Sequence, residues 1–235
     1  MTYFKGWNIY DMLFLFAAII VPTIFLFALN SDPLTVFVAI FFLMYIQHES
    51  KAKPMAFVFG LIMLALYTVL VINLSLYGEI IVNVGIILPV CIYGLVSWFK
   101  NKRKCNERGV VVIVNKIKHK EFVLVTLAVV VLGVGTYFML DAFNTEFLIL
   151  STLSIMTAVF ANYFLARRNQ LGTLVSLPYD IVQLTLWITV TVTYDTSAAV
   201  LIASVSMGLI NDIYGYFTWR KLRKSQLLIL SHSNS

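Results

Sequence analysis

The chain has 235 residues, of which 60% are hydrophobic and 12% are charged, and its mean hydropathy is +0.90. A soluble domain carries roughly 25% charged residues, so this chain has too few polar residues to cover a water-exposed surface. The formal net charge is +6, but the basic residues are placed as a membrane-topology signal, and we expect no nucleic-acid partner. Cys91 and Cys105 show neither a paired framework nor metal-ligand spacing, so we expect no disulfide and no metal site.

Apolar runs alternate with short polar breaks along the whole chain, and they predict about eight helices. Most of these exceed the roughly 17 residues needed to cross the hydrocarbon core. Pro22, Pro89 and Pro178 fall inside apolar runs, where proline should kink or break a helix. The polar stretch 99–121 is too short for a soluble domain and is interpreted as a connector. The predicted helices are 9–29, 34–48, 55–74, 79–98, 122–140, 146–166, 172–192 and 197–219.

All 17 Lys and Arg residues fall on one side of this arrangement. They precede the first helix, follow the second, sixth and eighth helices, and fill the connector. The opposite loops hold acidic residues and no Lys or Arg: Asp32, Glu79, Asp141, Glu146 and Asp195. The positive-inside rule therefore predicts a multi-pass protein of the plasma membrane with both termini in the cytoplasm. With an odd number of helices, the Lys and Arg residues would fall on both sides of the membrane.

Two segments resemble each other. Residues 92–98 (IYGLVSW) and 213–219 (IYGYFTW) both read Ile-Tyr-Gly-x-x-hydroxyl-Trp and are followed by a basic cluster. Both end on the basic side, so the copies share one orientation, which requires an odd number of helices between two three-helix repeats. Parallel repeats are a transporter architecture, with the substrate near the midplane between them. In the alternative interpretation, Tyr and Trp form interfacial belts and Gly packs helices, as in any membrane protein.

The predicted fold is therefore an all-α membrane bundle of 3+1+3 helices, preceded by one extra helix. We divide the chain into an N-terminal helix (1–33), a first repeat (34–99), a connector with the linking helix (100–140), a second repeat (141–224) and a cytoplasmic tail (225–235).

Ionisable groups at membrane depth cost roughly 2.5–3.5 kcal/mol and are functional candidates by default. Asp180, Gln183 and Trp187 follow i, i+3, i+7 spacing, so they share one face of their helix. Asp212 is a second intramembrane acid. If Asp180 and Asp212 face one cavity, they favour a cationic solute or titrate as a coupled pair.

Asparagine residues add to this set at three positions: Asn83, Asn162 and Asn211. The alternative for all of these polar groups is that they only hydrogen-bond one helix to another. Catalytic motifs are absent from the sequence, since no metalloprotease, nucleophile-elbow or phosphate-loop pattern occurs. We therefore expect no enzyme, no catalytic residue and no cofactor.

The same residues resemble the PnuC family of nicotinamide riboside transporters. Residues 211–219 are similar to the family's Asn-Ala-Ile-Tyr-Gly-Tyr-x-x-Trp ending, and residues 76–79 with Pro89 and Gly94…Trp98 resemble its Tyr-Gly-Glu…Pro…Gly-x-x-x-Trp stretch. A further similar pattern is formed by Asp141-Ala142, Thr145, Ser154 and Arg167-Arg168. The likeness covers about residues 34–224.

The resemblance implies a 3+1+3 bundle related to SWEET sugar transporters. It also implies facilitated uptake, with a cytoplasmic kinase that traps the vitamin by phosphorylation. Many members have Gln where Cys91 stands and Asn where Asp180 stands, and both positions are implied to face substrate. The tryptophans that usually open the seventh helix are replaced by Thr173 and Ser176, whereas Asn211 is retained.

We expect a transporter of nicotinamide riboside or a similar nucleoside-like vitamin, embedded in the bilayer. One alternative is a transporter of thiamine or another cationic vitamin, with or without proton coupling; another is a membrane scaffold or sensor that binds without transport. Whether the chain forms a homo-oligomer is left open. The candidate substrate-binding residues are Asp180, Gln183, Trp187, Asn211, Asp212, Tyr214, Asn83 and Cys91.

Overall fold

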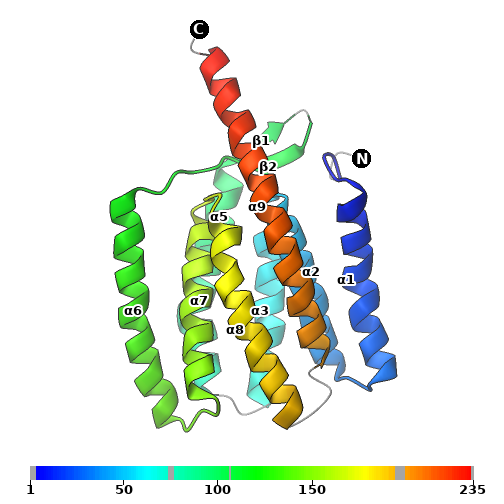
Figure 1. The fold of residues 1–235 in the computed structure, drawn as a ribbon, viewed down its shortest axis with the longest axis vertical. Helices are drawn as coiled ribbons and strands as arrows, with labels where there is room; N and C mark the ends of the chain where they lie inside the picture. Colours follow the sequence, from blue (N-terminus) through cyan, green and yellow to red (C-terminus); the bar gives the residue numbers. More distant parts are fainter. Residues whose placement is uncertain (1–3, 74–76, 106, 194–198, 234–235) are drawn as a thin grey trace.

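Long helices stand side by side in the computed structural model, which describes residues 4–73, 77–105, 107–193 and 199–233 (Figure 1). The first half of the chain forms α1 (Ile9–Ala28), α2 (Pro33–Ser50), α3 (Ala56–Asn73), α4 (Tyr77–Val82), the π-helical segment η1 (Asn83–Ile87) and α5 (Leu88–Lys100). A short antiparallel hairpin follows, made of β1 (Lys102–Cys105) and β2 (Gly109–Val112). The second half forms α6 (His119–Ala142), α7 (Leu148–Ala166), α8 (Gly172–Thr193) and α9 (Ala199–Ser233).

The predicted number of membrane spans is confirmed. Within the described ranges, eight helices are long and apolar enough to cross a membrane, and the stretch Ile80–Lys100 counts as one of them. The second helix, predicted to end at residue 48, continues to Ser50 and so reaches 18 residues. Its start is fixed by Asp32, whose carboxylate accepts a hydrogen bond from the Thr35 N–H at 3.0 Å, and by Pro33, which needs no N–H partner in the first turn.

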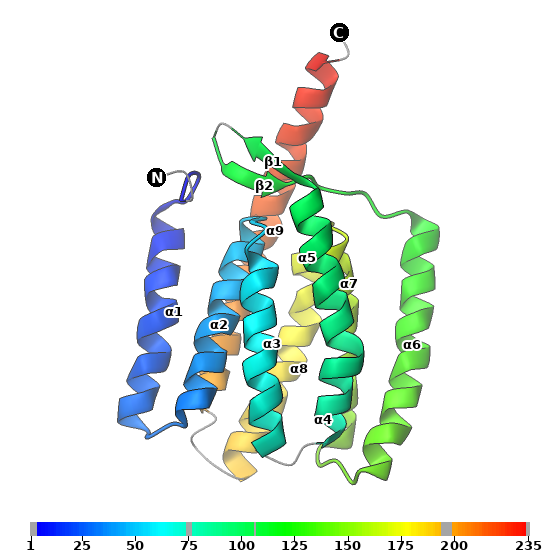
Figure 2. The ribbon, with the colours of Figure 1, turned by 180° about the vertical axis from the view of Figure 1, so that it is seen from behind.

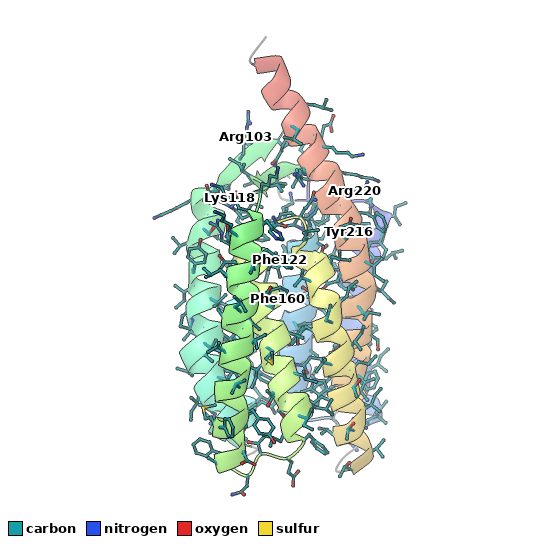
Figure 3. All side chains as sticks on the ribbon, turned by 60° about the vertical axis from the view of Figure 1, so that its left-hand side comes forward. Arg103, Lys118, Phe122, Phe160, Tyr216 and Arg220 are labelled. Carbon is teal, nitrogen blue, oxygen red and sulfur yellow. The ribbon has the colours of Figure 1, made fainter. Side chains whose placement is uncertain are left out.

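Both chain ends and the β1–β2 hairpin lie at the same end of the bundle (Figure 1). The basic residues Arg103, Lys118 and Arg220 also lie at this end, as Figure 3 shows. We call it the basic end. Asp195, one of the acidic loop residues expected at the opposite end, lies outside the described residues. Leu76, the first residue of the motif segment 76–79, also lies outside them.

Six spans form a closed ring. In sequence order around it, α2 packs against α3, α3 against α5, α5 against α7, α7 against α8, α8 against α9, and α9 returns to α2. α1 packs outside this ring against α2 and α9, and α6 packs outside against α7, so both stand at the edges of the bundle (Figures 1 and 2). The six spans of the ring therefore surround the centre of the bundle.

The intramembrane prolines act differently from one another. α1 and α8 run without a break through Pro22 and Pro178, so neither proline ends its helix. Near Pro89 the helix widens instead into η1, where the Leu88 N–H bonds the Asn83 carbonyl, five residues back. Because proline cannot donate an N–H and its ring crowds the preceding turn, a wider turn accommodates it. Such π segments are frequent at functional sites.

The connector packs against the bundle through its hairpin. Val111 and Val112 of the hairpin are buried in one cluster with Trp98 and Trp219. The Val112 N–H donates to the Ala52 carbonyl at 3.0 Å, which ties the hairpin to the α2–α3 turn. α9 does not end at 219 but continues to Ser233, and the Gln226 amide donates to the Val112 carbonyl at 3.0 Å. The hairpin and the end of α9 together cover part of the basic end.

The turns after α2 and α7 have the same geometry. Ala52 and Arg168 both adopt left-handed backbone angles, with φ of 53° and 56°. The Ala52 N–H donates to the Glu49 carbonyl, and the Arg168 N–H donates to the Leu165 carbonyl, each at 2.8 Å. Neither residue is glycine, so the same uncommon conformation at both turns indicates a matched local structure.

The two motif tryptophans also make matched contacts. Trp98 of α5 donates its indole N–H to the Leu165 carbonyl of α7 at 2.7 Å, and Trp219 of α9 donates to the Glu49 carbonyl of α2 at 2.9 Å. Both rings are fully buried, and their centroids lie 5.6 Å apart in an edge arrangement. Trp98 thus bonds α5 to α7, and Trp219 bonds α9 to α2.

Candidate functional site: a carboxyl-lined cavity inside the ring

A cavity of about 150 Å³ lies inside the ring and is lined by side chains from all six of its spans. A cavity of this size is large enough to hold a single aromatic ring. The cavity brings together most of the predicted site residues: Asn83, Cys91, Asp180, Gln183, Trp187 and Asp212.

Asn211 and Tyr214 are not among the lining residues. The Asn211 amide donates to the Ile46 carbonyl at 2.9 Å and so joins α9 to α2. The Tyr214 hydroxyl accepts from the Asn8 amide at 3.0 Å and from the Lys51 ammonium at 3.3 Å, next to α1. A helix turns about 100° per residue, so with Asp212 directed into the cavity these two neighbours face other helices.

Three carboxyl groups converge on the cavity. Asp180 and Asp212 are each 3% exposed, and Glu49 is 1% exposed. One oxygen of each of the three acids has no hydrogen-bond partner among the described residues. The described lining includes no Lys, Arg or His, so the negative charge has no basic counterpart there.

Glu49 is not among the site residues predicted from the sequence, because the second helix was predicted to end one residue before it. In the structure it lies in the last turn of α2 and faces inward. Helical spacing could have indicated Glu49, since Phe42, Tyr45, Ile46 and Glu49 follow i, i+3, i+4, i+7 spacing and all four line the cavity.

Aromatic rings line much of the remaining wall. Phe42 and Tyr45 come from α2, Tyr67 from α3, and Tyr179 and Trp187 from α8. Thr173 and Ser176 replace the tryptophans that open this helix in the family that the motifs resemble, but rings from three different helices still surround the cavity. Aromatic faces attract cations.

Two amide side chains supply further hydrogen-bonding groups. Gln183 donates to the Ser154 hydroxyl at 2.8 Å and to the Tyr179 hydroxyl at 3.1 Å, so its position is fixed between α7 and α8. Its carbonyl oxygen has no partner among the described residues. Asn83 begins η1, and its amide nitrogen is also without a partner within the described ranges. The cavity therefore offers several buried acceptors and one buried donor to a solute.

The charged groups at the basic end have environments of their own. Lys53 follows α2, and its ammonium donates to the backbone carbonyls of Lys5 at 3.3 Å and Arg108 at 2.5 Å. Burial, reinforced by the nearby charge of Lys51, lowers the pKa of Lys53 to about 8. Burial also lowers the pKa of Arg168, which donates to the Ser97 carbonyl at 3.2 Å.

Comparison with known proteins agrees with this architecture. The model of a family described as nicotinamide mononucleotide transporter matches residues 32–221. The chain belongs to this family. The nicotinamide riboside transporter PnuC of Neisseria mucosa is 24% identical over 227 residues, which cover 94% of this chain and 84% of that protein. A crystal structure of the vitamin B3 transporter PnuC matches with a TM-score of 0.81 at 21% identity, covering 94% of each chain.

The resemblance to PnuC that the motifs indicated is thus confirmed, and the fold is that of a membrane transporter. The family model starts after α1, at residue 32, and ends within α9, at residue 221. It therefore covers the whole ring of helices around the cavity.

Proposed function

We propose that the protein takes up nicotinamide riboside through the cavity inside the ring. The observation that carries this proposal is the set of unpartnered, buried carboxyl oxygens of Glu49, Asp180 and Asp212, placed among aromatic rings. Nicotinamide riboside presents a positively charged aromatic ring, ribose hydroxyls and a carboxamide. Carboxylates accept hydrogen bonds from hydroxyl and amide donors, and carboxylates and aromatic faces both attract a cationic ring.

A phosphorylated solute fits this cavity less well. Nicotinamide mononucleotide carries a phosphate, which proteins bind with Arg, Lys or backbone N–H groups. The described cavity lining has no Arg or Lys, and its three carboxyl groups repel a phosphate. We therefore place the nucleoside ahead of the nucleotide as substrate.

Thiamine is the second candidate, favoured by the same observation. Its thiazolium ring is also cationic, and its hydroxyl and amine groups are donors. A neutral nucleoside lacks the charge that the carboxyl groups would bind.

The orientation and repeat relationship belong to the same proposal. The basic end carries both termini, and the positive-inside rule assigns that end to the cytoplasm of a cell with this transporter in its plasma membrane. The matched turns after α2 and α7 and the reciprocal bonds of Trp98 and Trp219 support two related three-helix groups, α2–α5 and α7–α9, joined by α6. Cys91 and Asp212, each three residues before the glycine of its motif, both line the cavity.

We propose a facilitated mechanism in its simplest form, with no enzymatic step in the protein. The two groups of helices rock against each other around the central solute, which opens the cavity to one side at a time. A cytoplasmic kinase that phosphorylates the nucleoside removes the transported species and so maintains inward flux.

Uptake into proteoliposomes of the purified full chain tests the proposal. Radiolabelled nicotinamide riboside should enter faster than nicotinamide mononucleotide, and excess unlabelled nicotinamide riboside should compete. Faster entry of thiamine would transfer the assignment to that vitamin, and faster entry of the nucleotide would contradict it. Binding without entry of any of the three would indicate a scaffold or sensor.

A further inference from the structure

A buried group of polar side chains joins α1 to the ring at the basic end. The Lys51 ammonium donates to the Asp11 carboxylate at 2.7 Å, and the exposed fractions of these side chains are 9% and 0%. The Gln47 amide donates to the other Asp11 oxygen at 3.1 Å. The Tyr214 hydroxyl accepts from Lys51 at 3.3 Å and from the Asn8 amide at 3.0 Å. We call these five residues the α1 cluster.

The α1 cluster spans the seam between α2 and α9. Lys51 caps α2, whereas Tyr214 lies in α9, where its ring is 4.4 Å from that of Tyr10 in α1, measured between centroids. Asp11 holds both donors of the Tyr214 hydroxyl in place, because its carboxylate accepts from the Lys51 ammonium and also from the backbone N–H of Asn8, at 2.7 Å each. The start of α1 is therefore bonded to both sides of the seam.

Stability alone is a poor explanation for this cluster. The cost of removing two charges from water roughly cancels their attraction, so a buried ion pair is weak evidence for stability, and its best-attested use is in fixing a register or a switch. The family model begins at residue 32 and so leaves out α1. The contacts of α1 with the seam point to a role in how the ring moves.

We propose that α1 is a clamp that holds the α2–α9 seam closed at the basic end, with the Tyr214 hydroxyl as its contact point and Asp11 as its positioning residue. In the proposed mechanism α2 and α9 belong to different groups, so opening the cavity toward the basic end separates them. The bonds to the Tyr214 hydroxyl then break, and their strength sets the fraction of molecules open to that end. This inference rests on the proposed function, since it requires the two groups to move apart, but not on which solute is carried.

Cys91 is a natural reporter of this opening. Its side chain lines the cavity from α5, outside the α1 cluster, and is 6% exposed. A reagent dissolved in water therefore reaches the thiol only when the cavity opens. The chain has two cysteines, so replacement of Cys105 by alanine leaves Cys91 as the single thiol of the full-length protein.

The rate of Cys91 labelling from each side of the membrane tests the clamp. A small, impermeant, cationic methanethiosulfonate is added to inside-out and to right-side-out vesicles, and a Lys104→Cys chain without other cysteines shows which vesicles expose the basic end. Tyr214→Phe keeps the ring and removes the hydroxyl, so labelling from the basic end should become about fivefold faster. Asp11→Asn, which weakens the hold on both donors, should accelerate it about tenfold. Unchanged labelling in both variants would overturn the proposal.

A second ion pair provides the matched control. Glu121 of α6 accepts from Arg167, the residue that caps α7, also at 2.7 Å, but this pair does not cross the α2–α9 seam. Glu121→Gln should therefore leave the labelling rate of Cys91 unchanged. A clamp also predicts a change on one side only, so labelling from the end opposite the basic end should not accelerate in Tyr214→Phe or Asp11→Asn. Equal acceleration by Glu121→Gln, or acceleration from both sides, would indicate general loosening and contradict the clamp.

Addition of nicotinamide riboside separates the clamp from the choice of solute. A solute bound in the cavity should slow the labelling of Cys91 in the chain with an intact clamp. Labelling that nicotinamide riboside does not slow would count against the proposed solute. The ratio of labelling rates between Tyr214→Phe and the intact chain, measured without solute, would still decide for or against the clamp.

Discussion

Acidic and aromatic side chains in the cavity wall offer a solute different kinds of contact. Aspartate and glutamate oxygens provide charge and acceptors, while the rings of α2, α3 and α8 provide apolar and π surfaces. Gln183 is held by Ser154 and Tyr179, so its free carbonyl is presented in a fixed direction. Such prior fixing lowers the entropy lost when a solute binds.

Asp180→Asn tests the charge at this site. A hydrogen bond to a charged group contributes about 1.5–3 kcal/mol, so the substitution should weaken uptake of a cationic solute roughly 10- to 100-fold. Uptake of a neutral analogue of the same shape should change far less. Initial uptake rates in proteoliposomes measure both, with Asp141→Asn as the control. Equal losses for the two solutes would make Asp180 a structural residue.

Gly94 tests helix packing. A Cβ atom at this position would collide with the Phe57 ring, so Gly94→Ala should lower the free energy of unfolding by about 1–3 kcal/mol through overpacking. Gly135→Ala is the matched control, because its added Cβ would meet no described atom within 4 Å beyond its chain neighbours and the nearby backbone of its own helix. Thermal unfolding in detergent compares the two, and a Gly94→Ala protein as stable as Gly135→Ala would contradict this packing.

Lys53 gives a pH dependence with a definite sign. Its folded-state pKa of about 8 lies below the ordinary 10.5, so the unfolded chain binds more protons between these values. Stability attributable to Lys53 therefore rises as pH increases through this window. The melting temperature should increase more in the wild type than in Lys53→Met between about pH 7.5 and about pH 9.5. An identical response of the two proteins would contradict the prediction.

At the scale of elements, α5 is bonded to α7 and α9 to α2 through one tryptophan each. Trp98 and Trp219 donate these bonds, and their rings meet in one cluster with the hairpin residues Val111 and Val112. The acceptor carbonyls of Glu49 and Leu165 also bond the next turn. Loss of one indole N–H therefore leaves each carbonyl with a partner.

Trp98→Phe and Trp219→Phe should each cost about 1–2 kcal/mol of unfolding free energy, because each removes one buried hydrogen bond and part of a ring. The double variant should deviate from additivity by at least about 0.5 kcal/mol, since the rings are in contact. Trp7→Phe is the control, because the Trp7 indole nitrogen has no partner among the described residues. Strongly unequal costs at positions 98 and 219 would contradict equivalent roles.

At the scale of the whole molecule, charge and hydropathy determine how the ring sits in the bilayer. The hairpin, both termini and Arg220 of α9 all lie at the basic end (Figures 1 and 3). α1 and α6 stand outside the ring, and their exposed side chains include Leu13, Phe16, Leu124, Val131 and Phe138. In a membrane this surface is compatible with lipid.

Cysteine labelling in intact cells checks the orientation. In a chain whose Cys91 and Cys105 are replaced by alanine, Asp141→Cys should react with a membrane-impermeant reagent because it lies opposite the basic end. Lys104→Cys in the hairpin should react only after the cells are opened, since the positive-inside rule assigns the basic end to the cytoplasm. Labelling of both positions from outside would remove α6 as a span.

The sequence alone determined the membrane class, the eight spans and the sorting of charges, because hydropathy and Lys/Arg positions are read segment by segment. Asp180, Gln183 and Trp187 could be assigned to one face because helical spacing is local. Most of the site was predictable for this reason.

The tertiary structure decided which of these faces meet. The rotation of each helix about its axis is set by packing against its neighbours. Only the assembled ring therefore directs Asp212 inward, while Asn211 bonds Ile46 and Tyr214 bonds Asn8 at the start of α1. Glu49 joined the site because α2 continues past the predicted end. The order of the connector likewise depends on Ala52 and Gln226, which are distant in sequence. Long-range contacts of this kind leave no periodic signal in a single chain.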